Sequence, residues 1–133
     1  MTTTKSNRVI SEASTVKYNQ LEEYSTFDLL TELKTRGGHP GALAEAALLC
    51  MLKSYDYNQN SLNLDPHNVD RSNYFPFGVV SYAQMLHTKS QRFNSLALQD
   101  MRGVNTNFEG LRDTALDIIN YAGFFASAYT SGD

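Results

Sequence analysis

Three carboxylates follow one another at helical spacing near the end of the chain. Glu109, Asp113 and Asp117 stand four residues apart, and Asn120 comes three residues after the last of them. At about 100° per residue of an α-helix, all four side chains fall on one side of the helix. Oxygen ligands of this kind are those that Mg²⁺ prefers, so the row predicts a metal site. The alternative is a solvated helix face on which Glu109 merely completes a capping box.

Two basic residues occupy an otherwise apolar stripe earlier in the chain. Lys89 lies three residues after Leu86 and four before Phe93, and Arg92 lies at the edge of the same stripe. A lysine in such a stripe must extend its amine to solvent or find an anionic partner. The two cations therefore either form plain ion pairs with the carboxylates of the following helix or face the phosphates of a ligand.

The apolar stretch from residue 41 to 57 carries three charges, Glu45, Lys53 and Asp56. Asp56 lies at the expected helix end, where its negative charge opposes the helix dipole. This placement predicts a compensating cation or metal ion, and the alternative is a frayed, solvated helix end. The stretch is apolar nearly all round, which is typical of a helix at the centre of a bundle or in a dimer interface.

Aromatic residues flank the long Asn-rich loop that covers residues 58–75. Their rings offer stacking surfaces for a nucleobase, and packing in the core is the alternative. The residues are Tyr55, Tyr57, Tyr74, Phe75 and Phe77.

Composition narrows the class of protein. A chain of 133 residues fits one domain, and a net charge of −3 without any Lys/Arg run argues against a duplex nucleic-acid binder. No stretch approaches the roughly 18 apolar residues of a membrane span, and the single cysteine, Cys50, allows no internal disulfide. We therefore expect a cytoplasmic protein. The charged fraction of 19% is low, which indicates that a partner or a second copy covers part of the surface.

Four helices and no strand are the elements that would position these residues. Ser25 is a candidate helix cap, and Gly37 and Gly38 are candidate stops. Pro40 and Pro76 each suit the first turn of a helix. The expected helices cover residues 25–36, 41–57, 76–98 and 108–129, after a flexible arm over residues 1–19. Residues 20–133 would then form one all-α domain, a four-helix bundle.

Three segments together resemble the phage and bacterial nucleotide-modification-associated domain family, which is similar to the MazG-like, all-α nucleoside triphosphate pyrophosphatases. They are Lys53–Asn58 (KSYDYN), Lys89–Phe93 (KSQRF) and Glu109–Ala122 (EGLRDTALDIINYA). The last segment is the most specific, because it carries the pattern E-x-x-x-D-T-x-x-D-x-x-N-Y-A. The similarity covers about residues 40–128.

The resemblance implies a helical homodimer of MazG-like type that binds a nucleotide and Mg²⁺ between its helices. On that model the metal ligands are Glu109, Asp113 and Asp117, with Asp56 as a fourth, and the phosphate-binding cations are Lys89, Arg92 and Lys53. The further site candidates are Glu45, Asn120 and Tyr57. The family's active enzymes carry an E-x-x-E pair on the second helix, whereas this chain offers Glu45 alone.

The leading hypothesis is a Mg²⁺-dependent nucleoside triphosphate pyrophosphatase-like protein of phage or bacterial nucleotide metabolism. The first alternative is a binding protein that holds a nucleotide or a nucleotide signal on the same helical scaffold without cleaving it. The second alternative is a helical interaction protein whose carboxylates are only solvated.

Overall fold

The structure is a computed structural model that describes residues 20–57, 66–67, 69–103 and 108–129, with the backbone alone at residues 54–57 and 108–109. Its helices are α2 (Thr26–Arg36), α3 (Gly38–Tyr57), α4 (Val79–Met101) and α5 (Phe108–Ala128). The described residues contain no strand, so the prediction of an all-α protein is confirmed. The predicted arm over residues 1–19 lies outside the described residues.

Local capping sets the limits of α2. The Ser25 hydroxyl oxygen accepts a hydrogen bond from the Asp28 backbone N–H at 3.1 Å, which satisfies one of the free donors at a helix start. At the other end Gly37 adopts a φ of 76° and donates its N–H to the carbonyls of Leu33 and Lys34. Both predicted limits of this helix are therefore confirmed.

The turn between α2 and α3 depends on glycine. The positive φ angles of Gly37 and Gly38 reverse the chain within two residues, a conformation that glycine adopts without steric cost. One turn later, a Cβ atom on Gly41 would lie 3.1 Å from the Leu33 carbonyl oxygen. The missing side chain thus lets α3 approach the end of α2 closely.

The remaining helices differ from the expected limits by a few residues. Helix α3 starts at Gly38 rather than after Pro40, and α4 starts at Val79 rather than at Pro76. The delay in α4 follows from Gly78, whose φ of 61° is not helical. The capping box that Glu109 would complete at the start of α5 lies outside the described residues, because residues 104–107 precede this helix.

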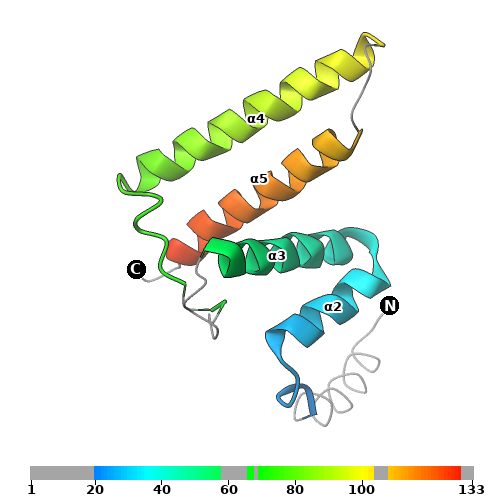
Figure 1. Ribbon diagram of the computed structural model, residues 1–133, viewed down its shortest axis with the longest axis vertical. Coiled ribbons are helices and arrows are strands. Elements are labelled where there is room, and N and C mark those ends of the chain that lie inside the picture. The colour runs from blue at the N-terminus through cyan, green and yellow to red at the C-terminus, as the bar shows by residue number, and fades with distance from the viewer. Residues whose placement is uncertain (1–19, 58–65, 68, 104–107, 130–133) are drawn as a thin grey trace, which may run out of the picture.

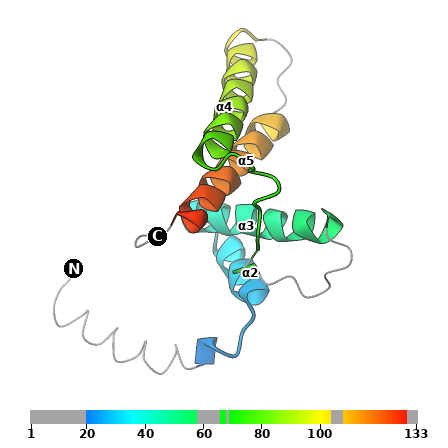
Figure 2. The ribbon, with the colours of Figure 1, turned by 90° about the vertical axis from the view of Figure 1, so that its left-hand side faces the viewer.

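The helices contact one another in the spatial order α2, α3, α5, α4. Helix α4 packs against α5, α5 packs against α3, and α3 packs against α2, while among the described residues α4 contacts neither α2 nor α3. Figure 1 shows α4 and α5 side by side, and Figure 2 shows α3 extending sideways from that pair. Helix α5 therefore connects the two halves of the molecule.

An aromatic cluster holds the start of α4 against the end of α5. The Phe75 ring stacks on Tyr82 with 4.0 Å between ring centroids and meets the edge of Tyr121 at 6.0 Å. Tyr82 in turn lies 5.7 Å from Phe125. Phe75 is 6% exposed, so core packing is the role of this loop aromatic.

Large apolar side chains also lie on the surface. On α2 the side chains of Phe27 and Leu33 are exposed. At the start of α4 the side chains of Phe77, Val79 and Val80 are exposed as well. Among the residues that the structure describes, the buried apolar residues are few: Ala44, Ala46, Leu48, Phe75, Tyr82 and Leu116.

Substitution of Phe75 tests the importance of the aromatic cluster. Phe75→Ala removes the ring that contacts both long helices, so we expect the free energy of unfolding to fall by about 3 kcal/mol. The matched control is Tyr24→Ala, which removes a ring that is 56% exposed and should change the free energy by less than roughly 0.5 kcal/mol. Urea unfolding followed by circular dichroism measures both, and equal losses would contradict this description of the core.

Candidate functional site

The Asp117 carboxylate on α5 lies between two lysines from different helices. Lys53 of α3 approaches Asp117 Oδ1 at 3.3 Å, and Lys89 of α4 approaches Asp117 Oδ2 at 3.3 Å. The side chains of Lys89 and Asp117 are 24% and 28% exposed, whereas Lys53 is largely exposed. Of the alternatives that its place in an apolar stripe left open, Lys89 thus takes the ion pair with a carboxylate of the following helix.

Sharing one carboxylate leaves positive charge near Asp117. Two ammonium groups carry two positive charges, and a single carboxylate neutralises one of them. Because Lys89 and Asp117 are partly buried, salt screens the remaining positive charge less than it would at a fully exposed site. An anion that approached Lys53 and Lys89 would therefore be attracted to this position.

Arg71 brings a third cation to the same region from the segment that precedes α4. Its guanidinium carbon lies 4.0 Å from the centroid of the Phe124 ring, and Nη2 lies 3.5 Å from Cys50 Sγ. Stacking on an aromatic face stabilises a guanidinium by roughly 0.5–2 kcal/mol. Among the described residues no carboxylate lies within ion-pairing distance of Arg71.

A local turn directs the Arg71 side chain toward α3 and α5. Asp70 Oδ1 accepts a hydrogen bond from the Ser72 N–H at 2.9 Å, and the Arg71 carbonyl accepts one from the Tyr74 N–H at 2.9 Å. The hydrogen bonds to the Ser72 backbone and side chain lower the pKa of Asp70. Because Phe75 anchors the end of this turn in the aromatic cluster, the Arg71 side chain is held between the two helices.

A cavity of about 310 Å³ opens beside Asp117, and we call it the basic cavity. Such a volume lies at the lower end of the range for small-molecule sites. Its walls combine charged side chains with aromatic rings. The lining residues are Cys50, Lys53, Val69, Asp70, Arg71, Asn73, Tyr74, Phe75, Asp117, Asn120, Tyr121 and Phe124.

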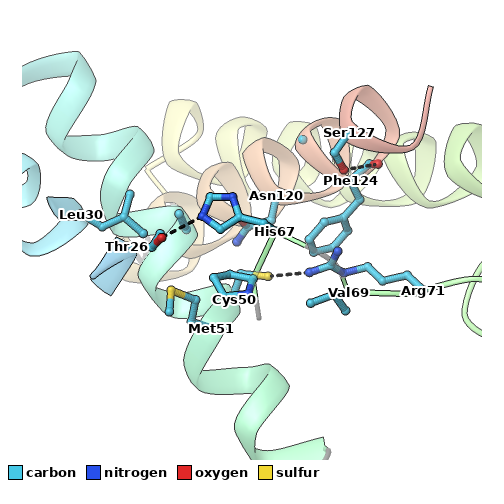
Figure 3. A pocket seen from close by; sticks show the side chains of 13 residues that line it. Thr26, Leu30, Cys50, Met51, His67, Val69, Arg71, Asn120, Phe124 and Ser127 are labelled. Atoms are coloured by element: carbon cyan, nitrogen blue, oxygen red, sulfur yellow. Dashed lines mark hydrogen bonds between the residues drawn. The ribbon is translucent and has the colours of Figure 1, made fainter. Parts of the chain in front are cut away.

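A second cavity of about 340 Å³ shares Arg71 and Phe124 with the first, and we call it the apolar cavity. Figure 3 shows Arg71 alongside the Phe124 ring, with Asn120 and His67 nearby. His67 Nε2 and Thr26 Oγ1 share a hydrogen bond of 2.8 Å across this cavity. The lining residues are Thr26, Leu30, Ala47, Cys50, Met51, Pro66, His67, Val69, Arg71, Asn120, Gly123, Phe124 and Ser127.

Glu45, a predicted site residue, pairs with Arg112 of α5. Arg112 Nη1 and Nη2 donate to the two Glu45 oxygens at 2.5 and 2.7 Å. The hydrogen bonds from Arg112 lower the pKa of Glu45, and its positive charge acts in the same direction. This bidentate pair occupies both oxygens of Glu45 and fixes α3 on α5.

Arg92 binds a hydroxyl group rather than a carboxylate. Its Nε donates to Thr114 Oγ1 at 3.3 Å, and the buried Thr114 hydroxyl donates to the Gly110 carbonyl at 2.7 Å. Arg92 is thereby held against α5 one turn before Asp117. Its remaining guanidinium donors form no ion pair with the described residues.

The predicted metal ligands are only partly described. The side chains of Asp56, Tyr57 and Glu109 lie outside the described residues. Asp113 is exposed on α5, and Asp117 is engaged by the two lysines. In the part of the chain that the structure describes, no three His, Cys, Asp or Glu residues come together as a metal site. Because Asp56 and Glu109 are two of the four predicted ligands, the Mg²⁺ site stays a prediction.

Asn120, the remaining predicted residue, lies on the walls of both cavities.

Arg71 was not predicted as a site residue. A sequence pattern that could have indicated it is the order Asp70, Arg71, Ser72, because Asp70 is a residue type that stabilises turns and Arg71 is the cation next to it. Phe75 follows as an aromatic residue that could pack in the core. This pattern predicts a turn, but it does not predict which helices the Arg71 side chain contacts.

No family model, curated protein or solved structure matches this chain. None of the helices in the described residues combines the length and the apolar character needed to cross a membrane.

The Glu45–Arg112 pair makes stability depend on pH. Because the folded-state pKa of Glu45 is lowered, its contribution is complete above the ordinary pKa of 4.5 and is lost as the pH falls through the folded-state value. We expect Glu45→Gln to be less stable than the wild type at pH 7, and the difference to shrink below pH 4.5.

Thermal unfolding of both proteins between pH 3 and 7 measures this effect. The control is Glu32→Gln, which breaks an exposed pair with Arg36 inside α2 and should change the free energy of unfolding by less than roughly 0.5 kcal/mol. A difference between wild type and Glu45→Gln that stayed constant down to pH 3 would show that the ion pair does not stabilise the fold.

Proposed function

We propose that this protein binds a nucleotide, with its phosphates in the basic cavity. The observation that supports the proposal is the convergence of Lys53, Lys89 and Arg71 from three separate segments around Asp117 and Asn120. The cavity wall carries two cations, Lys53 and Arg71, and two carboxylates, Asp70 and Asp117, and Lys89 adds a third cation through its ion pair with Asp117. A negatively charged ligand complements these three cations.

The types of cation favour phosphate as the anionic group. The Arg71 guanidinium presents a planar fork that matches two phosphate oxygens, and lysine ammonium groups bind phosphate as point charges. An incoming phosphate would share Lys53 and Lys89 with Asp117, so the lysines need not be reorganised from solvent. Positioning the cations before binding reduces the entropy lost on association.

An aromatic ring on the wall that both cavities share supports a ligand that carries a ring. Phe124 lines both cavities and stacks on the Arg71 guanidinium. The resemblance of residues 40–128 to the nucleotide-modification-associated domain family points to the same class of ligand. Together these features favour a nucleotide over inorganic phosphate alone.

A second candidate function is Mg²⁺-dependent hydrolysis of a nucleoside triphosphate to a monophosphate and pyrophosphate. It rests on the four-residue spacing of Asp113 and Asp117 on α5 and on the position of Asp117 at the cavity wall. Two carboxylates at this spacing can contribute to a Mg²⁺ site. Because Lys53 and Lys89 compete with a metal ion for Asp117, the described geometry favours binding over hydrolysis.

Substitution of Asp117 distinguishes the two candidates. For phosphate binding without a metal ion, Asp117→Asn frees both lysines, so affinity for inorganic tripolyphosphate in magnesium-free buffer should rise by up to about fivefold. If Asp117 is a Mg²⁺ ligand, the same substitution should instead abolish Mg²⁺-dependent pyrophosphate release from ATP, GTP, CTP or TTP. Calorimetry measures the first effect, and a pyrophosphate assay measures the second.

The matched control is Asp113→Asn, which removes an exposed carboxylate one turn away on the same helix. It should leave the magnesium-free affinity for tripolyphosphate unchanged, and loss of Mg²⁺-dependent turnover in this variant would support hydrolysis. Absence of any binding of tripolyphosphate or the four triphosphates by the wild type, with or without Mg²⁺, would rule out both candidates.

We further propose that two copies form a homodimer of MazG-like type. The small core and the exposed apolar side chains of Phe77, Val79 and Val80 support a covered surface at the start of α4. Sedimentation equilibrium at micromolar concentration is expected to give twice the mass of one chain. The double substitution Val79→Lys and Val80→Lys should shift the protein toward monomer, and a monomeric wild type would contradict the proposal.

A further inference from the structure

The basic cavity and the apolar cavity share a wall. Arg71, Asn120 and Phe124 line both of them, as do Cys50 and Val69, and Arg71 stacks on Phe124 at this shared wall (Figure 3). A ligand that reaches past this pair would contact both cavities. The two spaces differ in chemistry, because the charged groups Lys53, Asp70 and Asp117 belong to the basic cavity alone.

A glycine forms part of the apolar cavity in the interior of α5. Glycine is the least favourable residue after proline in the interior of a helix, and Gly123 has no positive φ that would require it. A Cβ atom on Gly123 would meet no heavy atom within 4 Å, so crowding does not require it either. The missing side chain does leave room in the cavity for another group to approach the α5 backbone.

The remaining walls suit a flat ring with polar edges. Leu30, Ala47 and Met51 supply apolar surface from α2 and α3. The Asn120 carboxamide offers both a donor and an acceptor and makes no hydrogen bond to another described residue. Apolar walls with a few convergent polar groups are typical of sites that recognise a heterocycle.

We infer that the apolar cavity binds the base of a nucleotide whose phosphates occupy the basic cavity, an inference that rests on the proposed function. The ligand class is a nucleoside phosphate that extends past Arg71, with its base beside Gly123 and its phosphates near Lys53. Asn120, at the boundary, hydrogen-bonds the base edge or the sugar. Inorganic tripolyphosphate would fill the basic cavity alone.

Filling the apolar cavity with a larger side chain tests whether it binds the base while the basic cavity binds the phosphates. Gly123→Leu places a side chain in the cavity, and Ser127→Leu does so from an exposed position one turn later. We expect both variants to bind the tightest ligand among ATP, GTP, CTP and TTP about tenfold more weakly, because stacking of the base is lost. Their affinity for tripolyphosphate should stay within about twofold of wild type, because the basic cavity is untouched.

The matched control is Ala122→Leu, which adds the same side chain at the exposed neighbouring position that lines neither cavity. It should leave both affinities unchanged, and circular dichroism should show that all three variants fold. If the two cavity variants keep wild-type affinity for the triphosphate while tripolyphosphate still binds, the base site is disproved and the proposed function survives. If wild-type protein binds neither probe, the proposed function fails and this inference fails with it.

Discussion

The Asp117 carboxylate connects two helices that do not contact each other. Lys53 on α3 and Lys89 on α4 both reach it, yet no backbone contact joins α3 to α4 within the described residues. Helix α5 lies between them, so any change in its rotation or position would separate Asp117 from at least one lysine. The meeting of Lys53 and Lys89 at Asp117, beside the basic cavity, therefore depends on how α5 packs against both neighbours.

Two other sets of contacts fix that packing. On one side, the bidentate Glu45–Arg112 pair fixes the register of α3 on α5. On the other, Phe75 and Tyr82 hold the start of α4 against the end of α5. The same Phe75 anchors the turn that carries Arg71, so the aromatic cluster positions the third cation as well. The contacts that hold the helices together thus also position the cations of the site.

Local signals were sufficient to predict the helices. Ser25 and Gly37 act through hydrogen bonds to residues within four positions along the chain, and such short-range geometry can be derived from residue types. The delayed start of α4 at Val79 was not predicted, because Pro76 suits a helix start and the conformation of Gly78 is set by the turn around it. The helical class was predictable, whereas the open order of α2, α3, α5 and α4 depends on tertiary packing.

The site residues also divide into those that local sequence patterns indicate and those that depend on tertiary packing. The stripe position of Lys89 predicted that its amine needs either solvent or an anionic partner, because burial of an unpaired ammonium is costly, and the structure pairs it with Asp117. The pairing of Glu45 with Arg112 was not predicted, because it depends on the register between helices that are distant in sequence. Arg71 was missed for the same reason, since its partners Cys50 and Phe124 lie 21 and 53 positions away along the chain.

A crystal structure of the protein with ADP, determined without and with Mg²⁺, tests the central claim most directly. We predict that the diphosphate lies within hydrogen-bonding distance of Arg71 and at least one of the two lysines, with or without the metal ion. A diphosphate bound elsewhere, or bound only through Mg²⁺ on Asp113 and away from Lys53, Lys89 and Arg71, would contradict the claim that these cations form the ligand site.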